Sequence, residues 1–362
     1  MMSHRTAMVV GSAPLDGPGG AEACCRALVR LLTGLGFETS YRSAAELIRR
    51  TPAARIPGRK LWWSLAEVLA AVRAADGRAD ITVTNGPVGW GIKGRIASVH
   101  YYHGTYVGQA DAVRSSITYP GYVKMRYLDG MLERLAGRGK TCVACSDRVR
   151  AEVGQWFGHE ARTVWLPVDI SLFAPGHKDT DLLKRLGIPS GKPVGLFVGA
   201  GRPVKGEHAA FEVMRSTGSM ISWLTLGERP RTELPAGVIL RDRVPPAQMP
   251  ALLRSVDLVL APSEYESFSL LIAETLAVGT PIVTSPCAGA AEFLMRDWPL
   301  AQWLVDDPHD IRSLVNVVLT IIGDLLTARE VALWGRARVG KLLSYGAWRA
   351  RFIEATGLMN LV

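Results

Sequence analysis

Residues 257–283 read "DLVLAPSEYESFSLLIAETLAVGTPIV", in which two short apolar runs flank a helical pattern. The two runs have the length and the β-branched content of buried strands. Between them, Ser267 or Ser269 can cap a helix that covers 268–278 and ends at Gly279. Because a strand, a helix and a second strand in this order form a parallel crossover unit, the stretch predicts a parallel α/β fold.

The same alternation fills two long tracts, which predicts two Rossmann-like, doubly wound domains rather than one large sheet. In the first tract we expect strands near 6–11, 80–84, 95–100, 140–145 and 162–166, and helices near 20–34, 62–75 and 147–157. In the second we expect strands near 194–199, 221–226, 238–240, 257–260 and 281–284, and helices near 206–216, 247–254 and 268–278. A chain of 362 residues is long enough for two such cores.

The polar, proline-bearing segment "DISLFAPGHKDTD" separates the two tracts, and the chain after 309 is helical without a further strand signal. We therefore predict an N-terminal domain at 1–173, a linker at 174–190, a C-terminal domain at 191–343 and a C-terminal helix at 344–362. Ligands of open α/β sheets bind at the carboxyl ends of the strands, so we expect the chemistry in a cleft between the domains.

Two carboxylates, Glu266 and Glu274, interrupt the otherwise apolar stretch. Glu266 is expected at the mouth of the helix and Glu274 about two turns in, which separates them by about 12 Å along the axis at 1.5 Å per residue. Paired glycosidase carboxylates lie about 5 to 9.5 Å apart, so a hydrolase pair is excluded. The free amides at the helix start attract anions such as phosphate. Two acids that bind hydroxyls, with a diphosphate between them, would suit a nucleotide sugar lying along one helix.

Two glycine-rich turns join a strand to a helix. In "FVGAGRPVKGEHAAF", Arg202 and Lys205 lie at the start of the next helix, where two cations can neutralise a diphosphate. In "GSAPLDGPGGAEACC", Gly19 and Gly20 let the backbone approach a ligand or simply turn tightly. This second turn lacks the G-x-G-x-x-G order, so a dinucleotide fingerprint is not supported.

The composition indicates a soluble, cytoplasmic protein. No stretch reaches the roughly 18 uncharged residues of a membrane span, and the N-terminus lacks a signal-peptide pattern. The odd number of cysteines fits a reducing compartment; they are Cys24, Cys25, Cys142, Cys145 and Cys287. Because "TCVACSD" has the pattern of a buried strand, we interpret the C-x-x-C of Cys142 and Cys145 as structural rather than metal-binding.

The formal net charge is +9, and the basic excess is densest in the segment 49–63, "RRTPAARIPGRKLWW". Cations beside tryptophans suit an anionic membrane surface, and peripheral contact with the inner membrane surface is one interpretation. The alternative, which we favour, is a solvated loop that leads into a helix with core tryptophans. We expect no nucleic-acid partner, because no helix-turn-helix, zinc or RNA-binding pattern accompanies the charge.

The stretch "PSEYESFSLLIAETLAVGTPIV" resembles the E-x7-E signature of the retaining glycosyltransferases of family 4, which have the GT-B fold. The resemblance covers nearly the whole chain. It implies that Glu266 binds donor-sugar hydroxyls and that Glu274 binds the ribose hydroxyls. It also implies that the backbone amides of Phe268, Ser269 and Leu270 face the donor sugar and phosphate.

Other segments carry further roles over from the family. "VGAGRPVKG" resembles V-G-R-x-x-x-x-K-G, so Lys205 would hold the diphosphate; Ala200 replaces the usual arginine, and Arg202 follows two places later. "SVHYYHGTY" resembles the family's H-x-x-H and makes His103 the active-site histidine, while we expect His100 to be a satisfied strand residue. Gly19 and Gly20 would belong to the donor site.

The resemblance implies a metal-independent hexosyltransferase that moves a sugar, with retention, from a nucleotide-diphosphate donor such as a UDP-sugar. The acceptor would be a hydroxyl of a small molecule, a glycan or a lipid-linked molecule, and no cofactor is expected. Two alternatives stay open: a GT-B nucleotide-sugar epimerase and a non-catalytic nucleotide-sugar-binding protein. Asp179 and Asp181 form a D-x-D, but "KDTDLLKRLG" indicates the start of a surface helix rather than a metal site.

Overall fold

The structure is a computed structural model that describes residues 5–17, 19–49, 64, 66, 68–69, 71–72, 79–230 and 232–361. The chain divides into two compact units. Unit 1 comprises Met1–Pro167 and Tyr345–Val362, and unit 2 comprises Val168–Ser344. The residues 174–190, predicted as a linker, lie within unit 2, and the last helix belongs to unit 1.

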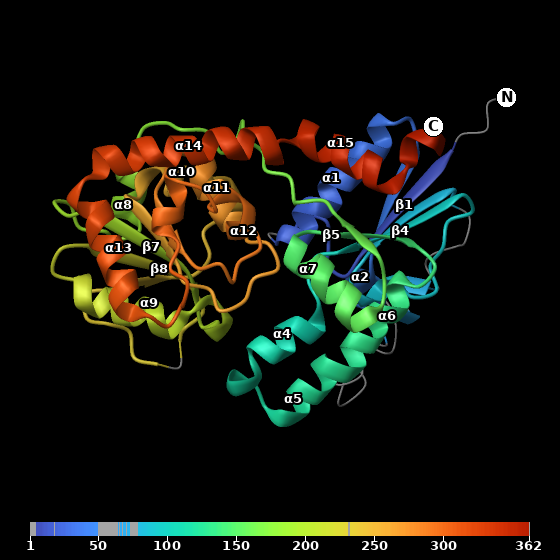
Figure 1. Ribbon diagram of the computed structural model, residues 1–362, viewed down its shortest axis with the longest axis horizontal. Coiled ribbons are helices and arrows are strands. Elements are labelled where there is room, and N and C mark those ends of the chain that lie inside the picture. The colour runs from blue at the N-terminus through green and yellow to red at the C-terminus, as the bar shows by residue number, and fades with distance from the viewer. Residues whose placement is uncertain are drawn as a thin grey trace. The chain divides into compact units, whose positions relative to one another are not determined.

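Unit 1 is built on a six-stranded sheet, within the described residues, in the order β2-β1-β3-β4-β5-β6 (Figure 1). All neighbouring strands are parallel. The strands are β1 (Thr6–Gly11), β2 (Glu38–Ser43), β3 (Ile81–Asn85), β4 (Ala97–Tyr102), β5 (Thr141–Ala144) and β6 (Ala161–Thr163). Since a parallel pairing needs a crossover, each strand starts a new passage of the chain across the sheet.

Helices cover this sheet: α1 packs on β1 and β2, α6 on β4, and α15 on β5. The α-helices are α1 (Gly20–Gly34), α2 (Ala44–Arg49), α4 (Tyr106–Ala112), α5 (Tyr119–Val123), α6 (Gly130–Gly137), α7 (Asp147–Glu152) and α15 (Tyr345–Thr356). The 3₁₀ segments are η2 (Pro87–Gly89), η3 (Arg114–Ser116) and η9 (Leu358–Leu361). The π segments η4 (Lys124–Asp129) and η5 (Val153–Phe157) continue α5 and α7.

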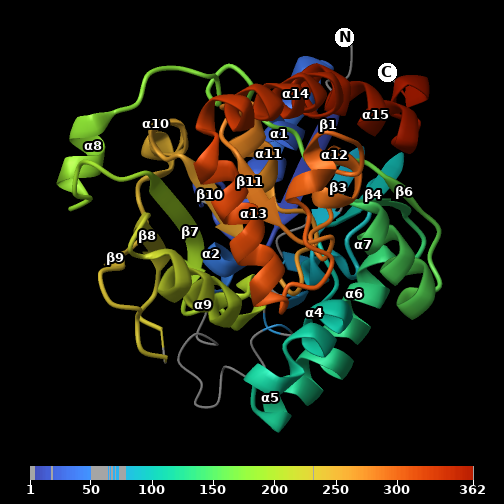
Figure 2. The same cartoon turned by 60° about the vertical axis from the view of Figure 1, so that its left-hand side comes forward.

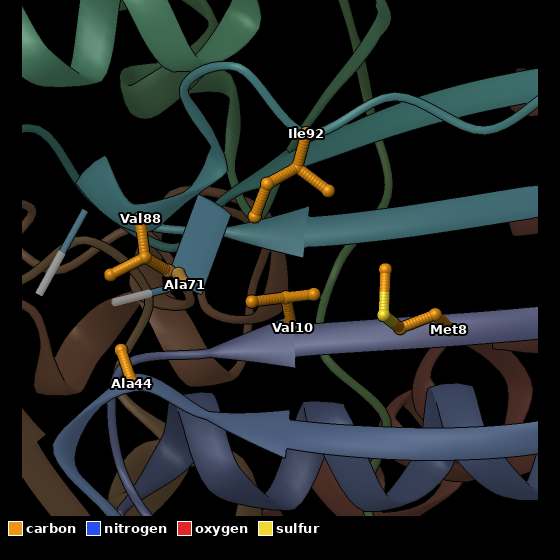
Figure 3. Packing of buried hydrophobic residues seen from close by; sticks show 6 residues of the cluster. All are labelled: Met8, Val10, Ala44, Ala71, Val88 and Ile92. Carbon is orange, nitrogen blue, oxygen red and sulfur yellow. The ribbon is translucent and has the colours of Figure 1, made fainter. Parts of the chain in front are cut away.

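Apolar side chains between the sheet and its covering elements form the core of unit 1. Figure 3 shows one part of it, where Met8 and Val10 of β1 lie close to Ala44, Val88 and Ile92. In α1, the buried residues recur at the three- and four-residue spacing of an amphipathic helix; they are Cys24, Cys25, Leu28, Leu31 and Leu32.

Unit 2 has a five-stranded parallel sheet, within the described residues, in the order β11-β10-β7-β8-β9 (Figure 2). The strands are β7 (Val194–Ala200), β8 (Ser222–Gly227), β9 (Ile239–Arg241), β10 (Leu258–Ala261) and β11 (Ile282–Thr284). The carboxyl ends of β7 and β10, which are neighbours in the sheet, lead into the two segments that carry most of the predicted site.

The helices of unit 2 pack on both its sheet and each other: α9 contacts β7 and α13, and α11 contacts α14 (Figure 2). The α-helices are α8 (Thr180–Arg185), α9 (Glu207–Thr217), α10 (Met249–Ser255), α11 (Leu270–Ala277), α12 (Ala291–Leu294), α13 (Ile311–Gly323) and α14 (Leu325–Leu343). The 3₁₀ segments are η6 (Pro203–Lys205), η7 (Pro246–Gln248) and η8 (Leu300–Trp303).

Two parts of unit 1 differ from the sequence prediction. The strand β2 was not predicted, because Glu38–Ser43 is mostly polar and lies at the edge of the sheet, where little of it is buried. The segment 106–137 was predicted without helices, but it contains α4, α5 and α6. Its glycines and proline read as loop residues, yet Thr105 and Thr118 cap α4 and α5 by accepting hydrogen bonds from backbone amides.

Within the described residues, no single helix is both long and apolar enough to cross a membrane. One bent pair of helices, Ile311–Gly323 with Leu325–Thr356, meets the length and composition criteria only when taken together.

Candidate active site

The first acid of the signature, Glu266, lies in the segment between β10 and α11. Its backbone forms an isolated parallel bridge with Ala288. The Glu266 amide donates to the Cys287 carbonyl at 3.0 Å, and the Glu266 carbonyl accepts from the Gly289 amide at 3.0 Å. The position of this residue is therefore fixed by backbone hydrogen bonds in both directions, independently of its side chain.

The carboxylate of Glu266 forms an ion pair with the ammonium of Lys205. The two side chains are 20% and 17% exposed, which leaves them accessible to a ligand but mostly shielded from solvent. The Ser263 hydroxyl donates to the second Glu266 oxygen at 3.3 Å. The structure thus brings together a predicted sugar-binding acid and the predicted diphosphate-binding lysine.

Backbone contacts join the segments on which these two side chains lie. The Val204 carbonyl in η6 accepts from the Glu264 amide at 3.0 Å and from the Tyr265 amide at 3.4 Å. Gly206 adopts a left-handed φ of 72°, and a Cβ there would lie 1.8 Å from the Pro262 carbonyl oxygen. Only glycine permits this close approach, so the turn after β7 is held against the turn after β10.

Helix α11 begins at Leu270, directly after an unusual residue. Ser269 has a φ of 76°, and it is the only non-glycine residue with positive φ among the described residues. Of the two serines predicted as possible caps, Ser269 occupies the N-cap position, but its side chain does not cap the helix: its hydroxyl oxygen is buried and has no hydrogen-bond partner within the described residues. A left-handed serine with an unpaired buried hydroxyl is locally costly, and such strain concentrates at functional sites.

The predicted donor-facing amides lie at this helix start. The amides of Phe268, Ser269 and Leu270 donate no hydrogen bond to any residue that the structure describes. Phe268 itself is buried, and its ring lies 6.0 Å from that of Phe293. α11 has neither a side-chain cap nor an acid in its first turn, so its positive end is open to an anion.

Glu274 lies in the second turn of α11 and is partly buried. Within the described residues its carboxyl group has no hydrogen-bond or ion-pair partner. Burial raises the pKa of Glu274 from 4.5 to about 8. A partly buried carboxyl group without a partner destabilises the folded protein. It also offers two acceptor oxygens to ligand hydroxyls.

Arg202 is exposed at the beginning of the loop that carries Lys205. Its amide donates to the Gly199 carbonyl at 3.0 Å, which closes the turn after β7. Its guanidinium has no partner in the part of the chain that the structure describes. The structure therefore places Arg202 on the same short loop as Lys205 but does not join it to Glu266.

Gly19 and Gly20 lie in unit 1, at the N-cap and first residue of α1. The Glu22 carboxylate folds back over this turn, because a Cβ on Gly19 would lie 2.1 Å from one of its oxygens. The Arg26 guanidinium ties the preceding loop by donating to the carbonyls of Leu15 and Gly17 at 2.7 and 2.9 Å. An acid in the first turn makes the start of α1 a weaker anion site than that of α11.

His103 directly follows β4 in unit 1, and its ring stacks on that of Tyr101 with the centroids 4.6 Å apart. Both ring nitrogens are buried without a hydrogen-bond partner within the described residues. Burial lowers the pKa of His103 from 6.5 to about 3, so the ring is neutral at physiological pH. A neutral imidazole has one donor and one acceptor, and both are unused here.

His100, expected to be a satisfied strand residue, is satisfied on one side only. Its Nδ1 lies 2.8 Å from the Thr84 hydroxyl oxygen, and its Nε2 has no partner within the described residues. The Lys140 ammonium donates to the same hydroxyl at 3.0 Å and to the Gly89 carbonyl at 2.6 Å. This buried network belongs to the interior of unit 1, and burial lowers the pKa of Lys140 to about 7.

The D-x-D residues behave as residues of a helix start. The Asp179 carboxylate accepts from the Leu182 amide at 2.8 Å and so caps α8, as the sequence pattern indicates. Asp181 is exposed and forms an ion pair with Lys184 at 3.3 Å. Across the described ranges, no group of three or more His, Cys, Asp or Glu side chains could hold a metal ion.

Within the described residues, Cys142 in β5 and Cys145 just after it form no disulfide, and both are buried. Burial raises the pKa of both thiols above the ordinary value. The basic segment 49–63, apart from the backbone of Arg49 in α2, lies outside the described residues, as does most of the helix predicted near 62–75.

Two polar residues that help to shape this site were not predicted from the sequence. Ser263 contacts Glu266, and Glu207 accepts a hydrogen bond from the Gly201 amide. Ser263 stands three residues before Glu266 in the signature and could have been found there. Glu207 follows the "VKG" segment as an ordinary first-turn acid, so the sequence held no sign of the bond to Gly201.

The chain is similar to known glycosyltransferases. The family model described as Glycosyltransferase Family 4 matches residues 18–172, and the model described as Glycosyl transferases group 1 matches residues 192–324. A D-inositol 3-phosphate glycosyltransferase from Segniliparus rotundus is 33% identical over 274 residues, 64% of this chain and 58% of the relative. A teichuronic acid biosynthesis glycosyltransferase of Bacillus subtilis, described as putative, is 23% identical over 218 residues, 59% of this chain and 54% of the relative. The chain thus spans about half the length of the curated relatives it matches.

Among solved structures, sucrose-phosphate synthase from Thermosynechococcus elongatus is similar with a TM-score of 0.78 and 20% identity, covering 99% of this chain and 100% of that one. Anabaena HepE, in complex with UDP and glucose, is similar with a TM-score of 0.73 and 18% identity, covering 98% and 100%. These likenesses define the fold class as GT-B. The family assignment comes from the two matching models, which assign residues 18–172 to Glycosyltransferase Family 4 and residues 192–324 to Glycosyl transferases group 1.

Proposed function

We propose that the protein transfers a sugar from a nucleotide-diphosphate sugar to an acceptor hydroxyl, with retention at the anomeric carbon. One observation carries the proposal: Lys205, Glu266 and the open start of α11 lie on joined segments, and the unpaired Glu274 follows on the same helix. A cation paired with one acid, then a helix start, then a second acid match a diphosphate flanked by two groups that carry hydroxyls.

The donor lies along α11 in this proposal. The diphosphate accepts hydrogen bonds from the amides of Ser269 and Leu270, and Glu274 accepts from the ribose hydroxyls. The helices α1 and α9, which follow the two glycine-rich turns, each carry an acid in the first turn, whereas α11 carries none, which favours α11 for the anion. UDP is the first nucleotide to test, because HepE was solved with UDP and glucose.

The leaving diphosphate gains negative charge as the bond to the sugar breaks. Lys205, the α11 amides and Arg202 supply donors and positive charge where this charge develops, so the proposed reaction needs no divalent ion. Glu266 fixes the sugar ring, and the neutral imidazole of His103 donates to or accepts from a sugar hydroxyl. No protein nucleophile is assigned. The acceptor hydroxyl attacks the anomeric carbon on the face from which the diphosphate departs, and its proton passes to the departing phosphate oxygen.

Incubation with a panel of nucleotide sugars tests this function. The acceptors should include D-inositol 3-phosphate, because relatives bear that name, and a cell extract that contains glycans and lipid-linked molecules. Free nucleotide that appears only with an acceptor, together with an α-linked product from an α-linked donor, is the expected result.

Other outcomes would identify the alternatives. Conversion of the donor to an isomeric nucleotide sugar without an acceptor would indicate an epimerase. Tight binding of a nucleotide sugar with no turnover in any mixture would indicate a binding protein. A product of inverted configuration would support the transferase function but contradict retention at the anomeric carbon.

A further inference from the structure

The loop after β7 carries both proposed diphosphate-binding cations, yet little of it is regular structure. It runs from Gly201 to Gly206, with the single turn η6 in its middle. Arg202 and Lys205 can act on a diphosphate only if this loop keeps one conformation, because long cationic side chains otherwise sample many positions. The groups that hold the loop are therefore part of how the site works.

The carboxylate of Glu207, the first residue of α9, accepts a hydrogen bond from the Gly201 amide. The residue is only 7% exposed, so the bond is shielded from water. Gly201 has a left-handed φ of 77°, and its amide finds no other acceptor in the described part of the chain. A bond between an ionised carboxylate and an amide is stronger than one between neutral groups.

This bond spans the loop from one end to the other. Gly201 directly precedes Arg202, whereas Glu207 follows Gly206 and Lys205, so the bond closes a ring that contains both cations. On the far side, the Val204 carbonyl accepts from Glu264 and Tyr265, next to Glu266. The loop is thus held at two separate points, one of which depends on a side chain.

We propose that Glu207 is a positioning residue for the transfer reaction: its bond to the Gly201 amide sets the loop that places Arg202 and Lys205 against the diphosphate. The proposal rests on the proposed function for its catalytic consequence. It also assigns the acid in the first turn of α9 a task other than ligand binding, since its carboxylate faces the loop and not a free helix end.

Three variants test this role. Glu207→Ala removes the acceptor, while Glu207→Gln keeps an acceptor oxygen and removes the charge. Glu212→Ala is the matched control, because Glu212 lies on the same helix and forms an exposed ion pair with Arg215. We expect Glu207→Ala to lower kcat about 10- to 100-fold with a smaller change in donor KM, since misplaced groups act mainly on the transition state. Glu207→Gln should recover most of the activity, and Glu212→Ala should match wild type.

Amide hydrogen exchange of the loop, measured without turnover, separates this inference from the proposed function. The Gly201 amide should exchange faster in Glu207→Ala than in wild type, and near the wild-type rate in Glu207→Gln. Unchanged exchange, or a lower Tm with kcat unchanged, would reduce Glu207 to a structural residue and overturn the proposal. If the Gly201 amide exchanges faster in Glu207→Ala but the wild type transfers sugar to no acceptor, Glu207 still holds the loop. The proposed transferase function would then be wrong.

Discussion

Lys205 and Glu266, 61 residues apart in the chain, form an ion pair that joins the turns after two neighbouring strands. Each is proposed to contact a different part of the donor, the lysine its diphosphate and the acid its sugar. In the absence of donor the two neutralise each other, so an incoming diphosphate competes with the Glu266 carboxylate for the lysine. This competition makes the consequences of changing either residue unequal.

Replacement of Glu266 by Gln should separate binding from transfer. The variant frees Lys205 from its anionic partner, so we expect UDP alone to bind at least as tightly as to wild type. Transfer should fall by about 10²-fold, because a group that fixes the reacting sugar is weakened. Calorimetry with UDP and initial rates of transfer measure the two effects, with Glu264→Gln as the control. A loss of UDP affinity as large as that of Lys205→Ala would contradict the assignment of Glu266 to the sugar.

Glu274 should make nucleotide binding depend on pH. Burial raises its pKa to about 8 in the free protein, whereas ribose hydroxyls that donate to it favour the charged form. Binding below pH 8 therefore releases a proton, so affinity for UDP should rise as the pH increases toward 8 and then level off. Calorimetry in buffers of different ionisation enthalpy measures that proton.

Two variants complete this test. Glu274→Gln should lose the part of the pH dependence that wild type shows beyond the titration of UDP itself. Glu274→Ala should weaken UDP binding by about 1.5 to 3 kcal/mol, the range for hydrogen bonds to a charged group. Equal affinities of wild type and Glu274→Ala would remove the ribose assignment.

Sequence periodicity was enough to predict the parallel sheets. The strands near 194–199, 221–226 and 281–284 appear within a residue or two of their predicted bounds, because buried parallel strands are apolar on both faces and stand out from their surroundings. The edge strand β2 has no such composition. In α4 and α5, threonine caps and the packing of the unit outweigh the glycines that suggested a loop.

The candidate site could be predicted only as far as its residues have a pattern of their own. The spacing of Glu266 and Glu274 and the "VKG" segment identified the acids and Lys205. The ion pair between Lys205 and Glu266 depends on the adjacency of β7 and β10, which no local pattern encodes. Ser267 and Ser269 were both possible caps because serine is a common N-cap residue, and the left-handed conformation of Ser269 is visible only in the backbone.

We expect His103 to lower the stability of the folded protein while it contributes to sugar transfer. The unfolded chain binds a proton on this residue below about pH 6.5, whereas the folded protein binds it only near pH 3, so stability falls as the pH decreases between these values. His103→Phe keeps a ring beside Tyr101 without the two unpaired nitrogens. Chemical denaturation should show a variant at least as stable as wild type at pH 7.5, with a growing advantage at pH 5, and transfer should be severely reduced. An advantage that stays constant with pH would contradict the depressed pKa.

The basic segment 49–63 can be tested directly. If its cations contact an anionic membrane surface, the protein should sediment with liposomes of acidic lipid at low salt and dissociate as salt screens the attraction. Replacement of Arg49, Arg50, Arg55, Arg59 and Lys60 by Gln should abolish sedimentation and leave transfer to a soluble acceptor unchanged. Sedimentation that depends on neither lipid charge nor salt would favour the solvated-loop interpretation.

Lys205 and a divalent metal are alternative means of neutralising the leaving diphosphate. The structure places the Lys205 ammonium beside Glu266, whereas Asp179 caps a helix and Asp181 pairs with Lys184. Lys205→Ala should therefore slow transfer by about 10² to 10³-fold, the usual loss when one donor to a developing charge is removed, and should leave the fold intact. Asp179→Asn made together with Asp181→Asn should retain activity, and wild type should turn over in excess EDTA. If EDTA abolishes activity and Lys205→Ala does not, a divalent metal rather than Lys205 neutralises the leaving diphosphate.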